Sequence, residues 1–331
     1  MSEFLKITND DQLIANQLIK FSDYNSKQKI EQLLKNTLSM SEHLNIDTNE
    51  VMLNIVSNVF NRLMVLDEHV LSIQPMEQPV GSLSRMVRTR NGFEINEQDI
   101  EAATRKFQVN LPLELCDVTK YHDLDPKIEI SKIVSQEVFY EITSELMHLL
   151  YELASQTNKH VIKHSETKSK YDEHIRTISD SIKSNTGRGL PNFVIVNKLG
   201  LAVLIRLYNF QQLIEVKNTQ DISYIGTVNL EPFGSTQINV LLAEVAEFAS
   251  NTKPILLFGY KSSTVDTGFF YCPYTLCHPA GITVGELDAR PRASFATRYT
   301  YSPDLWSSDP EVAERDSHFF GIIEGPVETS A

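Results

Sequence analysis

Residues 126–186 contain no glycine and, after Pro126, no proline, so helix can run unbroken through this segment. Asp125 can cap the first helical amides, and Pro126 suits the first helical position, where no amide hydrogen is needed. Apolar residues then recur every three or four positions in one stripe, namely Ile130, Val134, Val138, Ile142, Leu146, Leu149 and Leu153. We predict a helix from Pro126 to about Gln156, about 45 Å long, whose stripe faces a core and which serves as the spine of a domain.

Composition is typical of a globular protein with room for two domains. The chain has 331 residues, 41% of them hydrophobic, which is enough for sizeable cores. The net charge of −13 argues against tight, sequence-independent binding to nucleic acid, because such binding depends on neutralising phosphates. Three cysteines are too few for a disulfide framework, and no apolar run has the length of a membrane span or signal peptide. We expect synthesis in a reducing cytoplasm and no membrane partner.

Residues 8–66 carry three short amphipathic patterns separated by polar breaks, at 13–18, 30–38 and 51–63. No long hydrophobic strand lies nearby, so these helices must pack on something else. We interpret residues 1–75 as an extended helical arm that packs on a neighbouring subunit. The alternative is a small helical cap on the same chain.

Residues 76–115 have the pattern of a long β-hairpin. Side chains alternate between two faces from residue 83 to 90, Asn91-Gly92 is a favoured two-residue turn, and residues 107–115 alternate again. Charge is segregated along the hairpin, with arginines before the turn and acids after it: Arg85, Arg88, Arg90, Glu94, Glu97, Asp99 and Glu101. We predict that these residues contact a neighbouring subunit, and the alternative is a solvated surface hairpin.

The rest of the chain predicts a second helix followed by an α/β lobe. Tyr171, Ile175, Ile178 and Ile182 lie on one face of a helix that ends at Thr186-Gly187. Short apolar segments then predict strands or helices at 193–196, 199–207, 238–243 and 255–260. Strand-like pieces at 269–276 and 293–301 indicate a sheet that returns beside the spine, and the apolar residues 319–323 are expected to dock.

No catalytic set is recognisable in this sequence. The glycines of residues 187–189 follow a helix instead of opening one after a strand, so they predict a helix stop and not a phosphate site. His160 and His164 could share a helix face, but no third ligand follows at metal-binding spacing. Cys272 and Cys277 are expected to be structural. We predict no catalytic residue, no cofactor and no metal site.

Several short strings follow one another in order along the chain. They are Ile73-Gln74-Pro75-Met76, Thr186-Gly187-Arg188-Gly189, Asn192-Phe193-Val194-Ile195, Gly259-Tyr260-Lys261, Asp266 with Gly268, Tyr271-Cys272-Pro273-Tyr274 and Thr297-Arg298-Tyr299. Together they resemble the major capsid proteins of tailed bacteriophages of the T-even myovirus type, over a region from about Val51 to the C-terminus.

The resemblance implies the Hong Kong 97-type capsid fold, which is α+β. Its parts would be an N-terminal arm at 1–75, an extended β-hairpin (E-loop) at 76–115, a peripheral domain with the spine helix at 116–170 and 269–331, and an α/β axial domain at 171–268. It also implies a structural protein, not an enzyme, that assembles with itself as hexamers and pentamers into the icosahedral head shell of a phage.

The partners that the resemblance implies are scaffold, portal, vertex or decoration proteins. The shell would enclose double-stranded DNA without sequence-specific binding, and it would be assembled in the host bacterial cytoplasm before becoming the virion capsid. Two alternatives stay open: a vertex protein of the same family, which forms only pentamers, and an encapsulin-like nanocompartment shell that loads an enzyme.

Two features separate this chain from the family pattern. T-even capsid proteins carry a large insertion in the hairpin region, whereas about 35 residues lie here between Pro79 and Leu115. The family's amino-terminal segment is removed by a protease after a hydrophobic-x-Glu site. Glu42, in Met40-Ser41-Glu42, is a candidate site, while Leu66-Asp67-Glu68 lies in the part that resembles the mature arm.

Overall fold

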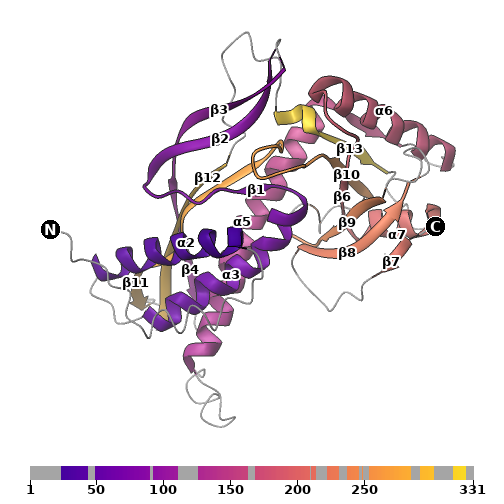
Figure 1. Ribbon diagram of the computed structural model, residues 1–331. Helices are drawn as coiled ribbons and strands as arrows, with labels where there is room; N and C mark the ends of the chain where they lie inside the picture. The colour runs from indigo at the N-terminus through magenta and orange to yellow at the C-terminus, as the bar shows by residue number, and fades with distance from the viewer. Residues whose placement is uncertain are drawn as a thin grey trace.

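Figure 1 shows the computed structural model of the protein, coloured from indigo at the N-terminus to yellow at the C-terminus. It describes residues 24–43, 49–89, 92–110, 126–162, 168–208, 210–213, 222–230, 237–245, 248, 253–284, 291–301 and 316–325. Within these ranges the architecture is α+β, with helices packed beside a four-stranded sheet, a seven-stranded sheet and a two-stranded hairpin.

Helix α5 (Pro126–Thr157) runs between the two larger sheets, and its bounds confirm the predicted spine (Figure 1). Its first residue is the proline that the sequence places at the first helical position. Most of the predicted stripe is buried and Leu149 is half-buried, the buried residues being Val134, Val138, Ile142, Leu146 and Leu153. The side chain of Ile130 lies outside the described residues.

Helices α2 (Tyr24–His43) and α3 (Asn49–His69) pack on their own chain, α3 along α5 and α2 along β11 (Figure 1). Their apolar faces belong to the same hydrophobic core as the α5 stripe, through residues such as Ile30, Leu33, Ile55 and Phe60. The interpretation of this segment as an arm on a neighbour is therefore wrong for residues 24–69, and the same-chain cap is right. The apolar faces need no second subunit because α5 and β11 already cover them.

The pattern at residues 13–18 lies outside the described residues. Glu42, the candidate cleavage position, lies in the last turn of α2. Leu66 of the second candidate is buried in α3 against the core.

The four-stranded sheet has the order β1-β11-β12-β4 and packs one face on the spine. Its strands are β1 (Ser72–Ile73), β11 (Phe270–Val284), β12 (Pro291–Tyr301) and β4 (Ala103–Asn110). Arg105 Nη2 lies 2.6 Å from Glu145 of α5, and the hydroxyl of Tyr299 donates to the same carboxylate at 2.7 Å. These bonds fix the sheet to the helix, and they confirm the sheet predicted beside the spine.

The seven-stranded sheet has the order β5-β13-β10-β6-β9-β8-β7. Its strands are β5 (Lys159–Val161), β13 (Phe320–Glu324), β10 (Ile255–Gly259), β6 (Phe193–Val196), β9 (Gln237–Ala243), β8 (Ile222–Asn229) and β7 (Phe210–Leu213). One face packs against α6 (Lys168–Thr186) and α7 (Lys198–Leu207), and the opposite face shares the core of α5.

Strand β13 and the short β5 come from segments that we assigned to the peripheral domain, yet they pair within this sheet. The predicted axial segment 171–268 therefore does not hold its whole sheet. The docking expected for residues 319–323 is confirmed, because this segment leads into and forms β13. The strand pairs antiparallel with β10 and parallel with β5. A short 3-10 helix, η3 (Asp316–Phe319), leads into it.

The hairpin consists of β2 (Val80–Thr89) and β3 (Gly92–Glu101), paired antiparallel from Val80–Glu101 to Thr89–Gly92. Gly92 is thus the first residue of β3, with a φ of 132°, and not a turn residue as predicted. Residues 90 and 91, which connect the strands, lie outside the described residues. In Figure 1 the hairpin stands above the four-stranded sheet and leans toward α6.

Candidate assembly site at the base of the hairpin

The hairpin is attached to the molecule along β2 by backbone and amide bonds. The amide of Met86 donates to the carbonyl of Val265 at 2.6 Å. The side chain of Gln74 donates to the carbonyl of Ser84 at 2.8 Å and accepts from its amide at 3.3 Å. An amide side chain can both donate and accept, so Gln74 bonds to the backbone N–H and C=O of Ser84 as a neighbouring strand would. The loop of residues 261–267 and Gln74, which follows β1, together hold one edge of the hairpin.

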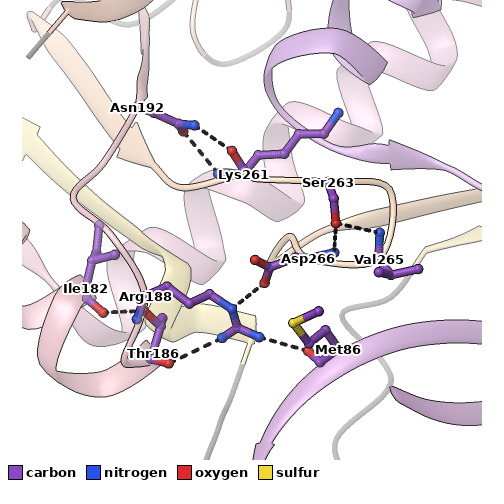
Figure 2. Close-up of polar contacts among 9 residues, drawn as sticks. All are labelled: Met86, Ile182, Thr186, Arg188, Asn192, Lys261, Ser263, Val265 and Asp266. Carbon is purple, nitrogen blue, oxygen red and sulfur yellow. Dashed lines mark hydrogen bonds and ion pairs between the residues drawn. The ribbon is translucent and has the colours of Figure 1, made fainter. Parts of the chain in front are cut away.

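Arg188 connects this loop, the end of α6 and the hairpin (Figure 2). Its side chain forms a buried ion pair with Asp266, and its Nη2 donates to the carbonyl of Met86 at 3.0 Å. Its guanidinium also lies 4.8 Å from the ring centroid of Phe319 and 5.1 Å from that of Phe93. Burial raises the pKa of Asp266, while the charge of Arg188 opposes that rise. The pair is therefore a buried clamp on the hairpin backbone.

The end of α6 places Arg188 in this position. Gly187 has a φ of 68°, the left-handed conformation that ends helices, so the predicted helix stop is confirmed. The amide of Arg188 then donates to the hydroxyl of Thr186 at 3.2 Å. The two glycines predicted the end of the helix, but nothing in the local sequence indicated that Arg188 between them contacts the hairpin.

The loop that receives Arg188 is itself tied down at its start. The side-chain amide of Asn192 pairs with both backbone groups of Lys261, as Figure 2 shows. The ammonium of Lys261 donates to the backbone carbonyl of Asp67 in α3, and the carboxylate of Asp67 pairs with Lys29 of α2 at 2.6 Å. Burial lowers the pKa of Lys261 to about 8. The hairpin is thus linked through one loop to α2, α3 and α6.

Two of the arginines predicted to contact a neighbour contact their own chain. Arg85 is buried, with its guanidinium 6.0 Å from the ring centroid of Phe270. Arg88 Nη1 donates to the carbonyl of Ser184 at the end of α6, at 3.2 Å. Arg90 lies outside the described residues. Arg85 and Arg88 therefore help to anchor the hairpin in this structure.

The acidic residues of β3, unlike these arginines, face solvent. Glu94, Glu97, Asp99 and Glu101 are all exposed. Directly opposed residues of an antiparallel pair share a face, so the pairs Ile95–Met86, Glu97–Ser84 and Asp99–Ser82 place Ile95 beside carboxylates on one face of β3. Ile95 is 65% exposed and Phe93 is 49% exposed. This face, with Ile95, Glu97, Asp99 and Glu101, is called the acidic face of β3 below.

The described residues offer little for catalysis or ligand chemistry. They include no group of three metal-ligating side chains, and the rings of His160 and His174 lie 5.0 Å apart between centroids. Cys272 and Cys277 are buried thiols, and burial raises the pKa of Cys272 to about 12. His164 and Cys116 lie outside the described residues. Among the helices that the structure describes, none is both long and apolar enough to span a bilayer.

A family model of the major capsid protein Gp23 matches residues 88–318 of this chain, which is well over half of it. The chain belongs to this family. The matched region begins in the hairpin and includes α5, Arg188 and Asp266, so the anchoring described above lies within it. As a member, the chain has the α+β Hong Kong 97-type fold, with α5 as the spine helix and β2–β3 as the extended hairpin.

Individual proteins also align with this chain. The major capsid protein of Vibrio phage KVP40 is 25% identical over 232 residues, which cover 62% of this chain and 44% of that protein. The chain thus spans less than half the length of this curated relative. A virus-like particle from Pyrococcus furiosus aligns with a TM-score of 0.46 and 10% identity over 84% of this chain and 98% of that one. A chain of Mycobacterium phage Adephagia aligns with a TM-score of 0.48 and 9% identity over 80% and 91%.

Proposed function

We propose that this chain is a shell-forming subunit, the major capsid protein of a tailed-phage head, and that it acts through contacts between copies and not through turnover. The observation that carries the proposal is the family match over residues 88–318. The proposed shell consists of hexamers and pentamers of the chain, encloses double-stranded DNA without reading its sequence, and forms in the host cytoplasm with scaffold, portal, vertex or decoration proteins.

The hairpin supports this proposal because its form suits contact with another molecule. A two-stranded ribbon alone is marginally stable in water, and a free strand edge invites pairing with a second chain. Here the ribbon is clamped at β2 by Arg188 and Gln74, while β3 pairs only with β2 among the described strands. The hairpin is therefore held at its base and exposes Ile95 and several carboxylates on its free strand. These features suit contact with a neighbouring subunit.

Symmetry makes such a contact effective. Exposed ion pairs contribute only about 0–1 kcal/mol each, but in a closed shell the same contact recurs on every subunit. A modest contact per copy can therefore decide whether the shell forms. The parts of the chain that fix the hairpin would then act as positioning elements for assembly.

Electron microscopy of the purified chain, expressed alone and with a scaffold protein, tests the proposal. Closed icosahedral particles are expected, and a chain that stays monomeric under both conditions would contradict it. Copy number in particles separates the two family members, because a vertex protein occupies only the pentamers. The nucleic-acid content separates a phage head from a nanocompartment, which would carry an enzyme cargo and no genome.

A further inference from the structure

Residues 72–79 join the body of the subunit to the hairpin and are called the stem below. The stem begins as β1, beside β11, and continues along β11 until the amide of Met76 donates to the carbonyl of Pro273 at 2.9 Å. At its other end the carbonyl of Pro79 accepts from the amide of Ala102, the residue after β3, at 2.8 Å. The position of the hairpin therefore depends on how firmly the stem is held.

Asn36 of α2 fixes the far end of the stem to β11. Its side-chain amide donates to the carbonyl of Met76 at 2.9 Å and to that of Tyr274 at 2.6 Å, and its oxygen accepts from Gln32 at 3.0 Å. Tyr274 lies at a register shift in the pairing of β11 with β12, and the extra residue at such a shift is left unpaired in the ladder. One buried amide thus joins the stem to the irregular point of the neighbouring strand.

Lys29 of α2 fixes the start of the stem through Asp67. One oxygen of the Asp67 carboxylate accepts from Lys29 at 2.6 Å, and the other accepts from the amide of Ile73 at 2.7 Å. Lys29 and Asn36 are about two turns apart on one face of α2, which is a rise of about 10 Å. The extended chain from Ile73 to Met76 spans about the same length. Helix α2 therefore holds the stem at both ends.

The stem in turn holds the base of the hairpin. Met76 is buried in a small apolar cluster that is separate from the main core. The other buried members of this cluster come from both hairpin strands, from the residue after β3 and from β11, namely Leu83, Ile100, Ala102, Phe270 and Cys272. Because Met76 belongs to this cluster and also bonds to Asn36, a displacement of α2 reaches both strands of the hairpin.

We propose that α2 is a strap that controls the hairpin. When α2 is seated, it fixes the stem and the hairpin keeps one orientation; when α2 is displaced, the stem is freed while the rest of the subunit stays folded. Separate release is possible because α2 packs on α3 and β11, whereas α3 packs on the spine itself. In the proposed function the hairpin is the assembly element, so the strap regulates assembly, and for this consequence the inference rests on the proposed function.

Hydrogen exchange of the full-length chain, measured by mass spectrometry, tests the strap. Asn36→Leu replaces the amide with an apolar group of similar size. Because two bonds to the stem and β11 are lost, exchange at the amides of Met76 and Ala102 should rise by roughly tenfold or more. Exchange at the amide of Ile322 in β13 should not change. Lys35→Leu, at an exposed position of the same helix, is the control and should leave all three amides as in the parent chain.

Gln32→Ala decides the matter if Asn36→Leu yields no folded protein. Gln32 orients the amide of Asn36 and is half-buried, so this change should raise exchange at Met76 by a smaller factor. Unchanged exchange at Met76 in the folded variant would overturn the proposal. An equal rise at Ile322 would also overturn it, because α2 would then be an ordinary part of a core that opens as one unit.

Assembly reactions separate the strap from the proposed function. A loosened hairpin must be ordered when it meets another subunit, so Asn36→Leu should lower the fraction of chain that sediments as shells several-fold. Normal assembly of this variant, in spite of faster exchange at Met76, would overturn the control of assembly by α2. If the parent chain forms no shells at all, the proposed function fails, whereas exchange at Met76 still decides whether α2 holds the stem.

Discussion

Arg188 and Asp266 form an ion pair beneath the hairpin, with side chains only 4% and 10% exposed. The two residues come from the end of a helix and from a loop between strands, and neither belongs to the hairpin that they hold. Arg188 reaches the hairpin through the carbonyl of Met86. A pair of charges in the body of the subunit therefore helps to fix the orientation of the hairpin.

Asp266→Asn should destabilise the subunit and loosen the hairpin, because it leaves Arg188 buried without its counter-charge. Breaking a buried pair by removing one partner costs about 3–5 kcal/mol of unfolding free energy. Urea unfolding measures the loss, and hydrogen exchange at the Met86 amide, which bonds to Val265, reports the hairpin. Glu173→Gln, which breaks the exposed pair with Lys170, is the control and should leave the unfolding free energy almost unchanged. Equal effects of the two changes would rule out the clamp.

Stability should rise with pH between about 8 and 10.5 through Lys261. Burial lowers the folded-state pKa of Lys261 to about 8 from 10.5, with Asp67 opposing the shift and Lys29 adding to it. The protonated form is therefore disfavoured in the folded chain, so unfolding free energy increases as pH passes upward through the folded pKa and levels off above the unfolded value. The gain is at most about 3 kcal/mol. Unfolding curves of the parent and of Lys261→Met across this window check it, and an identical pH dependence in both would disprove the role of Lys261.

Leu146→Asp should prevent folding of the subunit. Leu146 is 1% exposed on the core face of α5, and an unpaired buried carboxylate costs several kcal/mol against a total stability of about 5–15 kcal/mol. Ile128→Asp on the same helix is the matched control, since Ile128 is 47% exposed and an acid near a helix N-terminus is favourable. Circular dichroism of soluble protein compares them. A soluble, helical Leu146→Asp monomer would contradict the role of this stripe.

Reversal of the acidic face, with Glu97, Asp99 and Glu101 changed to lysine, should leave a folded monomer and abolish closed shells. These side chains are exposed, so the monomer loses no buried contact. Glu77→Lys, also exposed, is the control for charge alone. Changing the arginines of β2 to glutamate would test folding and not assembly, because Arg85 is buried and Arg85→Glu should destabilise the monomer. Normal shells from the triple lysine variant, seen by electron microscopy, would show that this face is not a contact.

Duplex DNA should bind the subunit weakly or not at all at physiological salt. The chain carries a net charge of −13, and two lysines of the basic cluster after the spine already pair with acids, Lys159 with Glu324 and Lys170 with Glu173. Direct phosphate contacts by Lys159, Lys163, Lys168 and Lys170 would instead give a log–log salt slope near −3.6. Fluorescence anisotropy with labelled duplex measures this, and a steep slope lost on changing the four lysines would defeat the expectation.

Local patterns in the sequence were sufficient for the elements that local forces determine. The proline at the start of α5, its apolar stripe and the glycine after α6 predicted bounds that the structure confirms. Periodicity shows that α2 and α3 each have an apolar face, but it does not show which surface covers that face, and the assignment to a neighbour was wrong for this reason. The turn was displaced by one residue because Gly92 suits both a turn and a strand with positive φ.

The candidate site was less accessible to sequence reasoning. Arg188 and Asp266 are far apart in the chain, and nothing in their local context indicates a pair. The charges of the hairpin were visible, but their environment was not: alternation places Arg85 on the same face as Leu83 and Val87, which is the buried one. That alternation was the available signal, and it favours an anchoring role for Arg85 over an exposed one.

Strand β13 lies inside the seven-stranded sheet, between β5 and β10, although it is the last of the described strands in chain order. A ribosome must therefore finish residue 324 before this sheet can close. Until then β10 exposes an unpaired edge and β5 has no partner, so a shortened translation product cannot complete its fold. Only chains that were synthesised through β13 can close this sheet, so completion of the fold depends on the last of its described strands.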